Sequence, residues 1–104
     1  MSGISTHVLD TTEGRPAAGM QVRLEINDPL WYGVGGGVTD TNGRIAQLLP
    51  DGEPLRAEQY RLTFYTNGPF YPEIAITFQI ADPSAHYHVP LLLSPYGYTT
   101  YRGS

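Results

Sequence analysis

The sequence has no cysteine and few basic residues, and each shortage excludes a class of protein. Without cysteine the chain can form no disulfide framework, thiolate metal site or thiol nucleophile. Six Lys and Arg residues against ten Asp and Glu give a net charge of −4, so the basic face that nucleic-acid binding requires is missing. No apolar run approaches the roughly 20 residues of a membrane helix, and residues 1–20 do not resemble a signal peptide. We therefore expect a cytoplasmic protein with no nucleic-acid and no membrane partner.

The chain is rich in the residues that make turns and short strands, with 12 Gly, 9 Pro and 8 Tyr. Residues 20–27 alternate between apolar and polar side chains, a pattern that predicts a half-buried strand. Asn42-Gly43 predicts a hairpin turn between two strands. Eight such segments at a spacing of roughly ten residues indicate an all-β sandwich or barrel, formed as one domain over residues 1–104. The expected strands are residues 4–10, 20–27, 31–38, 44–49, 60–66, 73–80, 86–94 and 97–103.

The C-terminal residues 86–104 form the most unusual stretch. They are expected to form two strands joined by a Pro-Tyr-Gly turn. In the first of these strands the odd positions are apolar, whereas the even positions mix polar and apolar residues: His86, His88, Pro90, Leu92 and Ser94. Because side chains alternate between the two faces of a strand, one face belongs to the core and the other suits a buried interface or a ligand cleft.

Several candidate sites have an ordinary interpretation beside the functional one. His7 and Arg44 are residues that are usually solvated on a strand or after a turn. His86 and His88 share one strand face and could supply two zinc ligands with His7 as a third, although this spacing is common by chance. A Ser-His-Asp triad is not expected, since the sequence has no Gly-x-Ser-x-Gly elbow and Ser104 is its last residue.

Three sequence motifs, which follow one another along the chain, contain the candidate residues His7, Arg44, His86 and His88. They are Ser5-Thr6-His7-Val8-Leu9-Asp10, Thr39-Asp40-Thr41-Asn42-Gly43-Arg44 and the whole of residues 86–104 with its final Tyr-Arg-Gly-Ser. Together the segments resemble the 5-hydroxyisourate hydrolases, the transthyretin-related enzymes of urate breakdown, over nearly the whole chain. Transthyretin, the hormone-carrying relative, lacks the two histidines, the arginine and the terminal tetrad, so the resemblance is to the enzymes.

The resemblance implies an eight-stranded transthyretin-like β-sandwich of the Greek-key, prealbumin-like type. It also implies a homotetramer, a dimer of dimers whose active sites lie in a channel at the dimer–dimer interface. Relatives usually carry a short helix between the fifth and sixth strands. Residues 65–73 are too short for that helix and its connections, so we expect a direct, hairpin-like connection here.

The resemblance further implies that His7, Arg44 and His88 are catalytic. The residues expected to bind or shape the purine-derived substrate are His7, Arg44, Tyr101, Ser104, Pro90 and Leu92. The reaction would be hydrolysis of 5-hydroxyisourate to 2-oxo-4-hydroxy-4-carboxy-5-ureidoimidazoline, with no metal and no cofactor required.

These residue types suit that reaction. Attack of water on an amide carbonyl needs a base that is active near neutral pH, and histidine has an ordinary pKa of about 6.5. Arginine stays cationic and can stabilise the developing oxyanion. Either histidine could be the base. Two rival interpretations remain: a transthyretin-like module that binds small aromatic ligands without turnover, and a structural sandwich of the kind attached to secreted enzymes.

Overall fold

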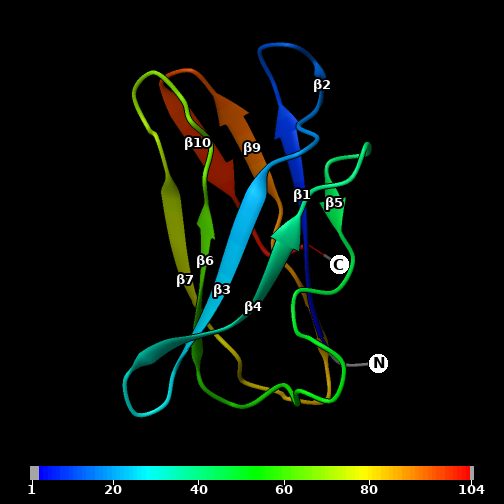
Figure 1. Cartoon of the computed structure of the whole chain (residues 1–104), viewed down its shortest axis with the longest axis vertical. Coiled ribbons are helices and arrows are strands. Elements are labelled where there is room, and N and C mark those ends of the chain that lie inside the picture. The colour runs from blue at the N-terminus through cyan, green and yellow to red at the C-terminus, as the bar shows by residue number, and fades with distance from the viewer. Residues whose placement is uncertain (1–2, 104) are drawn as a thin grey trace.

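The structure, a computed structural model, describes residues 3–103 and consists of two β-sheets packed face to face (Figure 1). Its strands are β1 (Gly3–Asp10), β2 (Arg15–Pro16), β3 (Gln21–Asn27), β4 (Trp31–Val38), β5 (Arg44–Ile45), β6 (Gln59–Phe64), β7 (Ile74–Gln79), β8 (His86–His88), β9 (Leu91–Ser94) and β10 (Gly97–Thr100). None of the described residues is helical. In particular, that part of the chain holds no helix of the length and apolarity needed to cross a membrane.

The front sheet of Figure 1 is antiparallel, with the strand order β4-β3-β6-β7. Its inward positions are those that the alternation predicts, since Val22, Leu24 and Ile26 on β3 are no more than 2% exposed. Burying such aliphatic side chains stabilises the fold by about 1.5–3 kcal/mol each. The prediction of a β-sandwich is therefore confirmed in its layers and in the face that each of these residues occupies.

The second sheet is organised around β1. The first strand pairs antiparallel with β2 and β5 and parallel with β8 and β9, and β10 completes this sheet beside β9. Ile4, Thr6 and Val8 point into the core and are at most 1% exposed. The alternate residues of β1, such as Ser5 and His7, consequently lie on the outer face, as the alternation predicts.

The prediction of a hairpin at Asn42-Gly43 is wrong. Strand β5 pairs with β1 in the opposite sheet, so the chain crosses between the sheets at residues 39–43. The turn itself is tight, because the N–H of Gly43 donates to the carbonyl of Asp40 at 2.9 Å. An Asn-Gly signal reports a reversal of the chain, and the pairing partner of the next strand is decided by tertiary contacts.

The fourth predicted strand, residues 44–49, is shorter than expected, with only Arg44–Ile45 in the ladder. Beyond it Leu48 links the two sheets: its N–H donates to the carbonyl of Ile4 and its carbonyl accepts from the N–H of Gly36, both at 2.9 Å. A strand cannot continue its ladder while its backbone groups are used in this way.

The predicted strand over residues 86–94 is interrupted at Pro90, which has no N–H to donate. Strands β8 and β9 keep the same register against β1, as the pairs Gly3–His86 and Val8–Leu91 show. The final predicted strand ends at Thr100 rather than at 103, and the turn predicted over residues 11–19 contains the two-residue strand β2.

The expected loss of the short helix is confirmed. Strands β6 and β7 are joined by residues 65–73, and the N–H of Asn67 donates to the carbonyl of Pro72 at 2.9 Å across this connection. Thr66 Oγ1 donates to the carbonyl of Tyr71 at 2.5 Å, which fastens the same turn. The two strands are therefore connected as a hairpin with a long, aromatic turn.

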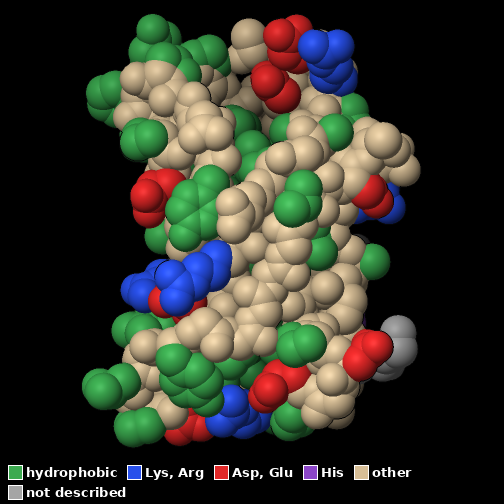
Figure 2. Space-filling model, viewed as in Figure 1, with side chains coloured by type: hydrophobic (Ala, Val, Ile, Leu, Met, Phe, Trp, Pro, Cys, Tyr) green, Lys and Arg blue, Asp and Glu red, His purple; other side chains and the backbone are tan. Residues whose placement is uncertain are grey.

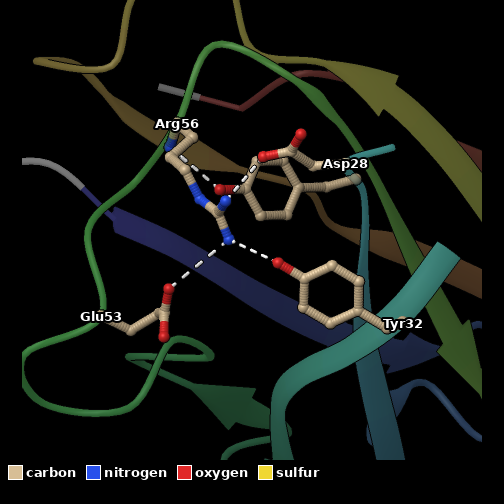
Figure 3. Close-up of polar contacts among 5 residues, drawn as sticks. Asp28, Tyr32, Glu53 and Arg56 are labelled. Atoms are coloured by element: carbon tan, nitrogen blue, oxygen red, sulfur yellow. Dashed lines mark hydrogen bonds and ion pairs between the residues drawn. The ribbon is translucent and has the colours of Figure 1, made fainter. Parts of the chain in front are cut away.

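The loop that precedes β6 is fastened by Arg56 (Figure 3). Its guanidinium lies 2.7 Å from a carboxylate oxygen of Asp28, donates to the hydroxyl of Tyr32 at 2.9 Å, and lies 3.7 Å from Glu53. The backbone N–H of Arg56 donates to the hydroxyl of Tyr60, which anchors the loop to the core.

The outer face of the front sheet carries arginines and acidic residues, and Figure 2 shows no histidine on this view of the molecule. On this sheet Glu25 is only 8% exposed and accepts from Arg61 Nε at 3.0 Å, while Arg61 also covers the ring of Trp31. The candidate catalytic residues belong to the other sheet.

Candidate active site

The outer face of the second sheet brings three distant segments together. His7 on β1 pairs with Arg44 on β5, and Ser5 on β1 pairs with His88 on β8. Gly43 makes the first of these pairings possible, because a Cβ at this position would collide with the carbonyl oxygen of Val8. The N–H of Val8 instead donates to the carbonyl of Gly43 at 2.8 Å. The backbone of β5 thereby approaches β1 closely enough to place Arg44 beside His7.

Asp40 orders the turn that leads to Arg44. Its carboxylate oxygen Oδ1 accepts from the backbone N–H of Asn42 at 2.8 Å and from that of Arg44 at 3.0 Å. The hydrogen bond from the Arg44 N–H is the main reason why the pKa of Asp40 is lowered. The carboxylate of Asp40 therefore stays ionised in the turn that leads to Arg44.

His88 is held from two sides. Its Nδ1 lies 2.8 Å from Ser5 Oγ, and the same hydroxyl lies 2.8 Å from Nε2 of His86. On the other side the backbone of Gly103 packs against the ring, since a Cβ there would lie 2.6 Å from Cδ2 of His88. The N–H of Gly103 donates to the carbonyl of His88 at 2.8 Å. These contacts leave Nε2 as the ring atom of His88 that is available to a substrate.

The electrostatic surroundings keep His88 neutral. Burial lowers its pKa below the ordinary 6.5. Neighbouring positive charges lower this pKa further, namely those of His7, His86 and Arg44. A neutral imidazole with a free nitrogen can accept a proton near pH 7, which is what a general base must do.

A polar cleft of about 470 Å³ lies at this place, and it is lined by Ser5, Thr6, Asp40, Arg44, Ile45, Ala46, His86 and His88. Two of the three predicted catalytic residues, Arg44 and His88, line this cleft directly. His7 is not among the lining residues, although it is half-buried and its backbone pairs with Arg44. The cleft is open to solvent in the single chain.

The predicted substrate-binding residues are more dispersed. Pro90 is buried and Leu92 is half-buried on the outer face of β9, where it pairs with Leu9. Tyr101 is 55% exposed and lines a different, apolar cleft of about 230 Å³, together with Phe78 and Tyr87 among others. Ser104 lies outside the described residues. Within one chain, Tyr101 is therefore not brought into the cleft of Arg44 and His88.

Three residues of the site were missed by sequence reasoning: Ser5, Asp40 and Gly103. Ser5 could be placed on the face of His7 by alternation, but its contacts depend on the register between β1 and β8. Asp40 carries the usual signal of a turn-capping aspartate. Gly103 belongs to the terminal Tyr-Arg-Gly-Ser motif, but its packing against His88 cannot be known before the fold is. Among residues 3–103, no group of three or more His, Asp or Glu side chains is arranged to hold a metal ion.

Comparison with known proteins identifies the family of the chain. Residues 4–103 match the profile described as the HIUase/Transthyretin family. The chain belongs to the HIUase/transthyretin family. Within the family it is 44% identical to the 5-hydroxyisourate hydrolase of Salmonella dublin over 110 residues, which cover 97% of this chain and 80% of that protein. It is 39% identical to the Arabidopsis thaliana uric acid degradation bifunctional protein TTL, of which it spans 37%.

Solved structures of the family share the fold. The structure of Klebsiella pneumoniae 5-hydroxyisourate hydrolase superposes with a TM-score of 0.85 at 36% identity, covering 99% of this chain and 100% of the other. Transthyretin from Sparus aurata superposes with a TM-score of 0.87 at 28% identity, covering 99% and 97%. The two superpositions are equally good, so the fold alone does not separate a hydrolase from a transthyretin. The site residues must do so.

Proposed function

We propose that this protein hydrolyses 5-hydroxyisourate to 2-oxo-4-hydroxy-4-carboxy-5-ureidoimidazoline in urate degradation. The observation that supports the proposal most strongly is the fixed and neutral imidazole of His88, which lines the same cleft as the guanidinium of Arg44. A base and a cation in one polar cleft are the two groups that hydrolysis of a cyclic amide needs. The greater identity to the Klebsiella pneumoniae hydrolase than to the Sparus aurata transthyretin points the same way.

In the proposed reaction His88 is the general base. Its free Nε2 takes a proton from a water molecule while the water oxygen bonds to the lactam carbonyl carbon. The C–N bond of the ring then breaks, and the imidazolium returns the proton to the leaving nitrogen. His7 lies on β1 and its backbone pairs with that of Arg44 on β5. In the proposed reaction His7 positions the water or shares in protonating the leaving nitrogen. The ring opens to a carboxylic acid and a freed N–H, and the acid then releases its proton to solvent as the carboxylate forms, so atoms and protons balance without a further reactant.

Arg44 has the role of binding the electron-rich substrate and stabilising the oxyanion formed at the carbonyl carbon. Its backbone is held by Asp40 and by pairing with β1, so its side chain starts from a fixed position. Preorganisation of this kind matters because a donor that is already in place needs no rearrangement when charge develops.

The active unit is proposed to be a homotetramer, a dimer of dimers with sites at the dimer–dimer interface. Two features support this assembly: the cleft is open in the single chain, and, among residues 3–103, β7 and β10 are edge strands that pair on one side only. Tyr101, Pro90, Leu92 and Ser104 are proposed to complete the substrate site in the assembled protein. The cytoplasm remains the predicted compartment.

The deciding experiment follows the ultraviolet absorbance of freshly generated 5-hydroxyisourate with and without the protein. We expect catalysed decay for the wild type, and a loss of rate of about 100-fold or more for His88→Ala and for Arg44→Gln. The matched control is Arg15→Gln, which removes an arginine that is exposed and 3.8 Å from Glu13. Wild-type decay no faster than the spontaneous rate would refute the proposal.

The same protein preparation tests the alternative, a transthyretin-like binding module without turnover. The likeness to Sparus aurata transthyretin keeps this function in view. It predicts saturable binding of a small aromatic ligand, measured by calorimetry, that survives His88→Ala. Binding without accelerated decay would favour this alternative over the hydrolase.

A further inference from the structure

Ser5 has no part in the reaction described above, yet it lies between His86 and His88. Its side chain is buried on the outer face of β1, and its Oγ lies 2.8 Å from both His86 Nε2 and His88 Nδ1. Its backbone is fixed as well, because the N–H of Val89 donates to its carbonyl at 2.9 Å. His86 is exposed and His88 is half-buried, and all three side chains line the cleft, with Ser5 joining the two rings.

The hydroxyl of Ser5 has one hydrogen to donate and can accept from two donors. In a first arrangement it donates to Nε2 of His86 and accepts from Nδ1–H of His88. In a second arrangement it donates to Nδ1 of His88 and accepts from Nε2–H of His86. If it accepted from both rings, its own hydrogen would have no other acceptor among residues 3–103, which is unfavourable for a buried hydroxyl.

The two arrangements give His88 opposite properties. In the first, His88 carries its hydrogen on Nδ1, so Nε2 has a free lone pair and can act as a base. In the second, Nε2 carries the hydrogen and can only donate. A protonated His86 has hydrogens on both ring nitrogens and must donate to Ser5. Protonation of His86 therefore favours the second arrangement and turns off the base.

We propose that Ser5 is a positioning residue whose single hydroxyl proton couples the exposed His86 to the base His88. The coupling rests on the proposed function, in which His88 Nε2 accepts a proton from water. It makes His86 the sensor of solvent pH and Ser5 the link that transmits its protonation state.

Other charged or titratable groups surround Ser5 and the two rings, and they affect the pKa of His88. They are His7 on β1, Arg44 on β5, and Asp40 in the turn that precedes β5. Electrostatic interaction with His7 and Arg44 lowers the pKa of His88, and the hydrogen bond from the Arg44 N–H lowers the pKa of Asp40. None of these groups lies between the two rings, so the link through Ser5 is separate from them.

The first test is spectroscopic and does not depend on turnover. The chain has only three histidines, so ¹⁵N-labelled imidazoles can be assigned with single His→Gln variants and their tautomers determined by NMR. At alkaline pH, where imidazoles are neutral, we expect the hydrogen on Nδ1 of His88 in the wild type and a different tautomer population in Ser5→Ala. Ser5→Thr keeps the hydroxyl and should restore the wild-type pattern. A His88 tautomer that is unchanged by Ser5→Ala would overturn the inference.

The second test is a double-mutant cycle on kcat, followed over pH. We expect Ser5→Ala and His86→Ala each to lower kcat by about 10-fold to 100-fold, less than removal of the base itself. His86→Ala acts by leaving His88 as the sole acceptor for the Ser5 hydrogen. If Ser5 and His86 act on His88 through the same hydrogen bonds, adding His86→Ala to Ser5→Ala has little further effect on kcat. The fall of kcat toward acidic pH should then be smaller in each single variant than in the wild type. Additive losses with an unchanged pH profile would refute the coupling.

The two tests separate this inference from the proposed function. If the wild type does not hydrolyse 5-hydroxyisourate, the proposed function fails and the NMR result still decides whether Ser5 links the rings. If hydrolysis is observed and the tautomers and the cycle show no coupling, the link through Ser5 fails alone. His86→Ala is a change at an exposed side chain, so the cycle retains one variant with little risk of misfolding.

Discussion

Gly103→Ala is expected to inactivate the protein without unfolding it. A Cβ at residue 103 would lie 2.6 Å from Cδ2 of His88, about 0.8 Å short of the 3.4 Å at which ordinary van der Waals contact begins. The ring has little freedom to withdraw, because its Nδ1 is held by Ser5 at 2.8 Å on the opposite side. A displacement of a catalytic group by about 1 Å can cost about 100-fold in rate. We therefore expect kcat to fall by about that factor.

The matched control is Gly97→Ala in the same hairpin. A Cβ at residue 97 would meet only the Ser94 hydroxyl at 3.5 Å, which is an ordinary contact. Both variants are compared with the wild type by the 5-hydroxyisourate decay assay and by thermal unfolding. We expect normal activity for Gly97→Ala and unfolding midpoints within a few degrees of the wild type for both. A fully active Gly103→Ala would show that the packing of His88 against residue 103 is irrelevant to catalysis.

Two further predictions concern charge. Arg102 lies 4.3 Å above the ring of Tyr87, so Arg102→Ala should cost only about 0.5–1 kcal/mol of stability in urea unfolding. Because the change loosens the neighbouring Gly103, it should lower kcat more than Arg15→Gln does. Equal kcat values for the two variants would contradict this prediction. The hydrogen bond from Arg61 is the main reason why the pKa of Glu25 lies below its ordinary 4.5. Such a carboxylate contributes stability above its unfolded pKa and loses that contribution as pH falls through the folded value. Urea titrations from about pH 6 to about pH 3 should show a smaller loss of stability for Glu25→Gln than for the wild type, and parallel curves would count against the contribution of Glu25.

The layers and faces of the sandwich follow from local patterns, because strict alternation determines which side chains can be buried. That is why Val22, Leu24 and Ile26 could be assigned to the core, and why Ser5 could be placed on the face of His7. The destination of the chain after Asn42-Gly43 could not be read locally, since a turn of the same sequence serves a hairpin or a crossing between sheets.

In the site, too, the residues could be predicted from local sequence, whereas their contact partners could not. The motifs identified Arg44 and His88, whereas the partners of His88 depend on the pairing of β1 with β8. The resemblance assigned Tyr101 to the substrate site, but the strand ends at Thr100 and in the single chain Tyr101 lines the other cleft. A period of two residues holds only while the backbone stays in the ladder.

The parallel pairing of β1 with β8 and β9 has a kinetic consequence. Most of the front sheet is built from near neighbours along the chain, whereas Ser5 meets His88 across 83 residues. Contacts so remote carry a large loop-closure entropy and form slowly. We expect refolding molecules to gain most of their β-structure while they are still catalytically silent, with turnover regained only when the two ends of the chain close against each other.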